Sequence, residues 1–301
     1  MIQSRTFADP AAVAAALERV GYLADAGVAT AAHLALRTGR PLFLEGDPGV
    51  GKTALAQALA DITDARLVRL QCYEGIDASQ ALYDWDFPRQ ILHLRAMADG
   101  PDRPEGYDPA RAEASLYDRR FLLDRPILQA LEGTPAVLLI DEIDRADDEF
   151  EAFLLEVLAD NAVTIPELGT IRAVTPPIVV LTSNRTREVH DALKRRCFYL
   201  WVAHPDFERE VQIVRGHLAD VPDRLARDVA GLMGTLRTMD LLKPPGVAES
   251  IDWTRALQVL GATRLDRTNA TATLGAAIKY REDQVRVERE VLPQLDGALV
   301  L

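Results

Sequence analysis

An eight-residue segment, GDPGVGKT at residues 46–53, constrains this chain more than any other part of its sequence. It follows a short apolar run at 42–44 and leads into a helical pattern that starts at Lys52. Glycines in such a loop let backbone N–H groups curl around an anion, and the positive end of the following helix favours negative charge. The pattern GxxxxGK[ST] between a strand and a helix therefore predicts a site for the phosphates of a nucleotide.

Two residues of this loop have separate expected roles. The Lys52 ammonium would contact the terminal phosphates, and the Thr53 hydroxyl would bind Mg²⁺. The residues expected to surround the nucleotide are Gly46, Asp47, Pro48, Gly49, Val50, Gly51, Lys52, Thr53 and Ala54.

Polar residues follow two further strand-like runs. The continuous apolar run 137–140 ends at Asp141 and Glu142. Beside a phosphate loop, Asp141 would hold the metal through water and Glu142 would polarise an attacking water. The run 178–181 leads to Asn184, whose carboxamide would hydrogen-bond that water or the γ-phosphate. The structural alternatives are a solvated strand end and an asparagine that caps a loop.

A basic stretch, LKRRC at 193–197, stands out in an acidic chain. In one interpretation it is a helix C-terminus, where the helix dipole favours cations. In the other it carries an arginine finger that reaches the γ-phosphate bound by a neighbouring subunit. Arg255 lies further along, where it would contact the same nucleotide or would be a solvated helical arginine.

Strand-like and helical segments alternate as far as residue 203, which predicts an α/β fold with a parallel sheet sandwiched by helices. We expect a partly helical insertion at 73–126 and a β-hairpin at 163–174. Residues 204–301 read as a separate, all-helical lid domain that follows a nucleotide-binding domain at 1–203. The expected strands are at 42–44, 67–70, 137–140, 178–181 and 198–202, and the expected lid helices are at 206–218, 222–239, 250–262 and 269–291.

Composition limits the partners and the compartment. The formal net charge of −12 disfavours nucleic acid as the main partner, because phosphate-binding surfaces carry a cationic surplus. The two cysteines cannot form a disulfide framework and are expected to be reduced. No apolar run is long enough to span a bilayer, so the expected location is the cytoplasm.

The order of these motifs resembles that of AAA+ ATPases. In that family the elements are Walker A (46–53), Walker B (137–142), sensor 1 (Asn184), an arginine finger and sensor 2 (Arg255). Within the family the chain resembles the MoxR group, and most closely its CoxD-like branch. The segments that carry this resemblance are QCYEGID at 71–77, YDWDFPRQ at 83–90 and DALKRRC at 191–197.

This resemblance implies a Mg²⁺-dependent ATP hydrolase that assembles into a ring, usually a homo-hexamer, and remodels a client protein. It implies a partner with a von Willebrand factor A domain and, for the CoxD-like branch, maturation of a molybdenum-containing carbon monoxide dehydrogenase. The finger would be Arg196 or Arg195, since MoxR proteins often have Asp and Phe on either side of the finger, and this chain has Arg195 and Cys197. A nucleic-acid motor or loader, and a scaffold that binds ATP without hydrolysing it, are the competing functions.

The aromatic and acidic segment 83–88 has two interpretations as well. Its Tyr83, Trp85 and Phe87 either form a small core within the insertion or are exposed to grip a client in the central pore.

Overall fold

The computed structural model describes residues 7–99, 113 and 115–296. Part of the expected insertion, residues 100–112 and 114, and the ends of the two expected domains, 1–6 and 297–301, lie outside these residues. The described chain packs into two compact units. The first contains residues 7–9, 30–44 and 59–200, and the second contains 10–29, 45–58 and 201–296.

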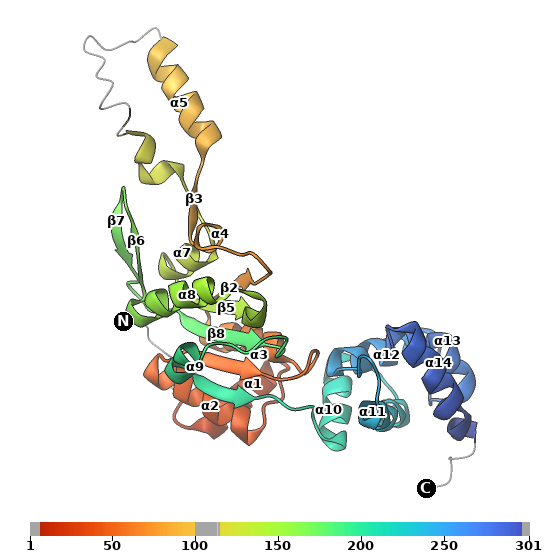
Figure 1. Cartoon of the computed structure of the whole chain (residues 1–301). Coiled ribbons are helices and arrows are strands. Elements are labelled where there is room, and N and C mark those ends of the chain that lie inside the picture. The colour runs from red at the N-terminus through yellow and green to blue at the C-terminus, as the bar shows by residue number, and fades with distance from the viewer. Residues whose placement is uncertain (1–6, 100–112, 114, 297–301) are drawn as a thin grey trace. The chain divides into compact units, whose positions relative to one another are not determined.

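The first unit is built around a five-stranded sheet in the order β2-β5-β8-β1-β9 (Figure 1). β2 pairs with β5 and β5 with β8, both in parallel, which confirms the predicted α/β fold with a parallel sheet. The strands are β1 (Leu42–Glu45), β2 (Arg66–Gln71), β5 (Ala136–Asp141), β8 (Ile178–Ser183) and β9 (Phe198–Trp201). Each expected strand is present, within one or two residues of its predicted ends.

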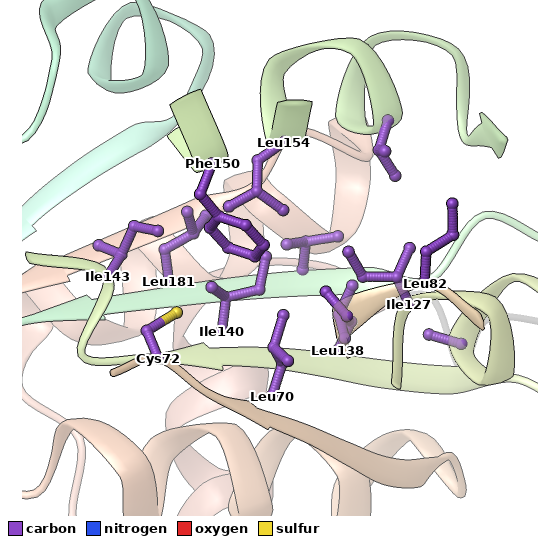
Figure 2. Packing of buried hydrophobic residues seen from close by; sticks show 14 of the residues in the cluster. Leu70, Cys72, Leu82, Ile127, Leu138, Ile140, Ile143, Phe150, Leu154 and Leu181 are labelled. Atoms are coloured by element: carbon purple, nitrogen blue, oxygen red, sulfur yellow. The ribbon is translucent and has the colours of Figure 1, made fainter. Parts of the chain in front are cut away.

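Helices connect these strands, as parallel pairing requires. Those before and between the strands are α1 (Pro10–Arg19), α2 (Ala26–Thr38), α3 (Lys52–Thr63), α7 (Pro126–Leu131), α8 (Asp148–Asp160) and α9 (Asp191–Arg196). Phe150 and Leu154 of α8 pack on Ile140 and Leu181 of the sheet (Figure 2). Residues that alternate with these along β5, such as Leu139, are also fully buried, so both faces of the sheet are covered.

The insertion between β2 and β5 has more regular structure than the sequence indicates. Residues 83–88 contain the strand β3 (Tyr83–Trp85) and the start of the helix α5 (Phe87–Asp99). β3 pairs antiparallel with β4 (Leu122–Asp124), and a one-turn helix α4 (Ala78–Ala81) precedes it. The strand was missed because its partner lies far along the chain.

The three aromatic side chains of the insertion have different environments. Tyr83 and Trp85 are half-buried against the core of the first unit, and Trp85 makes an edge contact with Tyr117 at 5.4 Å. Phe87, on the first turn of α5, is 60% exposed. Two of the three rings are therefore packed, against the core of the first unit rather than in a separate core within the insertion, and the third is exposed.

The predicted hairpin is confirmed as β6 (Ala162–Ile165) paired with β7 (Gly169–Arg172). It ends two residues earlier than predicted. Gly169 opens β7 with φ of +82°, a conformation that costs glycine less than other residues.

The C-terminal part is helical, with α10 (Phe207–His217), α11 (Asp223–Thr238), α12 (Val247–Val259), α13 (Arg267–Thr273) and α14 (Arg281–Glu290). The fully buried Trp253 lies at the centre of its core. The prediction of one helix over 269–291 is wrong, because a 3₁₀ turn at Leu274–Ala276 and a non-helical segment separate α13 from α14. Gly275 is a poor helix former, and the Gln284 side chain satisfies the carbonyl of Ile278 where the helix would otherwise continue.

Candidate active site

The phosphate loop lies in the second unit, between the end of β1 at Glu45 and the start of α3 at Lys52. Its Gly49 and Gly51 have φ angles of +78° and +95°, in the left-handed region that favours glycine. A Cβ atom at Gly46 would lie 2.2 Å from the carbonyl oxygen of Val202, so the backbones approach too closely for any side chain. The glycines of the motif are therefore required by the conformation of the loop.

Lys52 directs its ammonium into this loop. The side chain is buried, and Nζ donates hydrogen bonds to the carbonyl oxygens of Gly46 at 2.7 Å and Asp47 at 2.8 Å. Thr53 and Ala54 follow on the first turn of α3, and both are exposed. A buried cation beside a helix N-terminus suits a polyphosphate anion.

The C-terminal helical region contacts this loop through the start of α12. The backbone N–H of Val247 donates to the carbonyl oxygen of Gly49 at 3.0 Å, and a Cβ atom at Gly246 would lie 2.8 Å from the Cα atom of Gly49. Arg255, two turns along α12, is 58% exposed at its side chain and lies 3.6 Å from Asp252. The start of α12 thus contacts the loop through its backbone, whereas the Arg255 side chain is directed to Asp252.

His204 is a further neighbour of the loop that sequence reasoning missed. Its Nε2 atom lies 3.5 Å from Oδ2 of Asp47. Burial lowers the pKa of His204, and the nearby Arg237 and Lys52 lower it further, although the Asp47 carboxylate opposes them. A neutral imidazole is favoured beside the phosphate loop.

The second group of candidate residues lies in the first unit, at the carboxyl ends of β5 and β8. Asp141 is 3% exposed and accepts hydrogen bonds from the Thr182 hydroxyl and, at 2.6 Å, from Nη2 of Arg69. The same hydroxyl oxygen accepts the backbone N–H of Glu142 at 2.9 Å. Thr182 therefore joins the end of β8 to Asp141, the last residue of β5, and to Glu142, which follows it. The position of this hydroxyl in an apolar strand could have suggested such a role.

Glu142 and Asn184 lie within hydrogen-bond distance of each other. The Asn184 Nδ2 atom donates to Oε1 of Glu142 at 3.2 Å, while Oε2 accepts from Arg145 at 2.8 Å and Gln71 at 3.2 Å. Glu142 has φ of +56°, an uncommon backbone conformation for a residue with a side chain, and one that recurs at functional sites. The first unit thus brings together a partly exposed carboxylate and a carboxamide that hydrogen-bond each other directly, so that one water at their exposed side could contact both.

Asp144, which sequence analysis did not single out, holds the segment that carries Asn184. Its carboxylate is 3% exposed and accepts the backbone N–H of Asn184 at 3.2 Å. It also accepts the backbone N–H of Thr186 at 2.8 Å and the Thr186 hydroxyl at 2.7 Å. This buried acceptor fixes the backbone of the loop after β8.

Several carboxylates also surround a thiol. Burial, with the nearby Asp141 as the next cause, raises the pKa of Cys72 to about 12. Burial likewise raises the pKa of Cys197 to about 12. Both thiols are reduced and protonated at neutral pH, so neither is suited to nucleophilic or metal-binding chemistry.

The two candidate fingers lie on α9, also in the first unit. The Arg195 side chain is 82% exposed and lies 4.0 Å from Asp191. Arg196 is exposed as well, and its Nη1 atom donates to the carbonyl oxygen of Leu155 at 2.8 Å. Both guanidinium groups are accessible from outside the unit.

The expected metal ligands Thr53 and Asp141 belong to different units. Hydroxyl and carboxylate oxygens are the donors that Mg²⁺ prefers, so these residue types fit the metal. Within the described residues there is no cluster of three or more His, Cys, Asp and Glu side chains that could bind a metal alone. Among the described residues, no helix is long and apolar enough to cross a bilayer.

The chain is similar to several known proteins. The AAA domain of the dynein-related subfamily matches residues 41–197. The gas vesicle ATPase GvpN of Haloferax mediterranei is 28% identical over 212 residues, which cover 67% of this chain and 58% of that protein. Midasin of Giardia intestinalis is 54% identical over 48 residues, 16% of this chain and 1% of that protein. The Thermotoga maritima RuvB Holliday junction branch migration motor is 18% identical, with a TM-score of 0.44 over 81% of this chain and 65% of that one.

Proposed function

Because the chain belongs to the AAA domain family of the dynein-related subfamily, we propose that it hydrolyses ATP and uses that reaction to remodel other proteins. The chain spans less than two thirds of the gas vesicle ATPase that it matches.

The observation that carries this proposal is the pairing of Glu142 with Asn184 at the ends of neighbouring parallel strands. A carboxylate that acts as general base needs a water within hydrogen-bond reach and a second group that orients it. The exposed edge of Glu142 supplies the first requirement, and the Asn184 carboxamide supplies the second. Asp144 and Thr182 hold the two residues in place, because each accepts a backbone N–H, that of Asn184 and that of Glu142 respectively.

The phosphate loop supplies the binding half of the proposed reaction. Backbone N–H groups of residues 46–54 and the Lys52 ammonium would bind the triphosphate of ATP. Thr53 and Asp141 would hold Mg²⁺, which when bound neutralises charge on the phosphate oxygens. The Lys52 hydrogen bonds to the carbonyls of Gly46 and Asp47 support this role, because they hold the ammonium within the loop.

Full turnover would require a neighbouring subunit. A guanidinium from α9, Arg196 or Arg195, would stabilise the charge that develops at the γ-phosphate in the next subunit of a homo-hexameric ring. The exposure of both side chains supports action in trans. Residues 204–301 would act as a lid that responds to nucleotide, with Arg255 as its sensor and the contact between Val247 and Gly49 as a direct link to the loop.

We assign the chain to the MoxR group and its CoxD-like branch on the segments at 71–77, 83–90 and 191–197. The corresponding function is a cytoplasmic chaperone that works with a von Willebrand factor A-domain partner to mature a metalloenzyme, such as a molybdenum-containing carbon monoxide dehydrogenase. The net charge of −12 supports a protein client over nucleic acid.

The test compares Glu142→Gln with Glu149→Gln, which removes an exposed carboxylate on α8. Glu142→Gln should bind ATP with Mg²⁺ in calorimetry and lose phosphate release by about 10²-fold or more. Glu149→Gln should retain both properties. Normal turnover in Glu142→Gln would exclude Glu142 as the base, and no heat of ATP binding to the wild type would exclude the whole proposal.

The client is tested separately, by capture with the ATP-bound Glu142→Gln protein. A metalloenzyme recovered only in the presence of ATP would support the chaperone role. DNA-stimulated, salt-sensitive turnover would instead identify a nucleic-acid motor.

A further inference from the structure

The helix that carries the candidate fingers is secured at its C-terminal end by an arginine that no motif includes. We propose that Arg40 is a positioning residue, which fixes α9 so that its arginine reaches the nucleotide of a neighbouring subunit. This inference rests on the proposed ATPase function and adds a residue that acts on the finger through the backbone of its helix.

Arg40 donates to consecutive carbonyl groups at the end of α9. Its Nη2 atom lies 2.8 Å from the carbonyl oxygen of Arg195, and its Nε atom lies 3.2 Å from that of Arg196. Nη2 also reaches the carbonyl oxygen of Cys197 at 3.5 Å, and the guanidinium lies over the Phe198 ring at 4.9 Å. The contacts of Arg40 thus fall on the two candidate fingers and on the two residues that follow them.

The backbone beside Arg40 is joined to the same segment. The N–H of Phe198 donates to the carbonyl oxygen of Pro41 at 2.8 Å, where β9 begins. The segment that carries Arg40 is therefore fixed relative to the end of α9, so the Arg40 side chain can hold the helix in one position.

The chemistry explains why an arginine is suited to this place. The last carbonyl groups of a helix have no intrahelical donor, and the negative end of the helix dipole attracts a cation. A guanidinium offers several N–H groups in a rigid planar fork, so one side chain can serve neighbouring carbonyls, whereas an ammonium is a single compact charge. α9 has only six residues, too few to be stable without such external contacts.

The N-terminal side of α9 is attached to α8. Glu151, 1% exposed, accepts the backbone N–H of His190 at 2.7 Å and pairs with Arg187. Arg196 adds its contact with the carbonyl oxygen of Leu155, also on α8. α8 thus holds the N-terminal end of α9 and contacts the Arg196 side chain at its C-terminal end, while Arg40 donates to the backbone carbonyl groups of that C-terminal end.

The expected effect of losing Arg40 on kcat is smaller than the effect of losing the finger itself, but it is measurable. An arginine finger contributes about 10³–10⁵-fold to turnover, and a displacement of about 1 Å costs about 10²-fold. Arg40→Ala should therefore lower kcat by about 10–100-fold. The affinity for ATP should change by less than about twofold, because Arg40 contacts α9 rather than the phosphate loop. Arg40→Lys should recover part of the lost kcat, since it keeps the charge without the fork.

The matched control is Arg37→Ala. Arg37 is an exposed arginine on α2, three residues before Arg40, and its side chain makes no hydrogen bond or ion pair with another described residue. It should keep wild-type kcat. A kcat for Arg40→Ala that equals that of Arg37→Ala would overturn the inference.

A subunit-mixing experiment separates positioning of the finger from general loss of structure. Glu142→Gln subunits lack the base but carry a correctly held finger, whereas Arg40→Ala subunits keep their own base. Mixed rings should therefore regain activity that neither variant has alone, up to about a quarter of the wild-type rate at equal proportions under random mixing. A variant that is damaged in its own nucleotide site cannot be restored in this way.

The double variant Arg195→Ala/Arg196→Ala, mixed with Glu142→Gln, separates two claims: that Arg40 positions the finger, and that the finger acts on a neighbouring subunit. Recovery with this finger variant but not with Arg40→Ala overturns the positioning role and leaves the proposed function intact. No recovery with either one overturns action in trans and the inference together. If Arg40→Ala does not fold, as judged by circular dichroism, the same mixing experiment with Arg40→Lys decides.

Discussion

Loss of Arg237 should destabilise the C-terminal helical region strongly. Arg237 on α11 forms two hydrogen bonds with the carboxylate of Glu210 on α10, at 2.6 and 2.7 Å, and the side chains are 10% and 2% exposed. Arg237 also donates to the carbonyl oxygen of Pro245 at 2.8 Å, and Glu210 accepts the hydroxyl of Ser250 on α12. One ion pair thus joins three helices.

The magnitude follows from burial. Arg237→Ala leaves the Glu210 carboxylate buried without its cation, and breaking such a pair costs about 3–5 kcal/mol. Replacing both residues by apolar ones of similar size removes the unpaired charge. The double variant Glu210→Leu/Arg237→Met should therefore recover to within about 1 kcal/mol of the wild type.

The assay is guanidinium unfolding followed by the fluorescence of Trp253, at the centre of this core. A Trp85→Phe/Trp201→Phe background makes Trp253 the only tryptophan, since the chain has three. A loss below about 1 kcal/mol for Arg237→Ala would refute the reasoning, as would a double variant that is no more stable than the single one.

Four further predictions concern the candidate active site and the thiol of Cys72 beside it. Asp144→Asn should lower kcat about 10-fold, with little change in KM, in steady-state kinetics. The reason is that an amide has one acceptor oxygen for the three donors that Asp144 now serves. An unchanged kcat would exclude a role for Asp144 in positioning Asn184. Gly46→Ala should abolish ATP binding in calorimetry, because its Cβ atom would clash with the Val202 carbonyl, whereas Gly216→Ala, with open space among the described residues, should bind normally. Cys72, with its pKa raised to about 12, should resist iodoacetamide at pH 8 until the protein unfolds, and rapid labelling of the native protein would contradict that value. The folded state keeps this proton at pH values above 9.0, the pKa of an ordinary cysteine thiol, whereas the unfolded state loses it there. The free energy of unfolding should therefore fall as pH rises from 9 toward 12 in pH-dependent denaturation.

Local patterns account for the parts of the fold that were predicted. The strands at 42–44, 137–140 and 178–181 were identified because strands buried on both faces are continuously apolar. The errors fall where a distant partner decides the structure. β3 forms because β4 pairs with it across the insertion, and Gln284 serves the Ile278 carbonyl after α13 has ended.

The candidate site shows the same division. Lys52 could be proposed from sequence because it belongs to the glycine-rich loop motif after a recognisable strand. Asp141, Glu142 and Asn184 could be proposed because each lies at or just after the end of a recognisable strand. Thr182 and Asp144 were not proposed as supporting residues, because their roles consist of hydrogen bonds between β5 and β8 or between segments about 40 residues apart.

The amino-acid sequence by itself determined the phosphate loop and the order of strands and helices, because glycine conformations, apolar runs and helix signals act over a few neighbouring residues. Only the tertiary structure decided which groups support the expected machinery: the Arg40 guanidinium at the end of α9, Asp144 behind Asn184, and the Glu210–Arg237 pair among three helices. Each of these contacts joins residues far apart in the chain, and a hydrogen bond depends on distance in space rather than on separation in sequence.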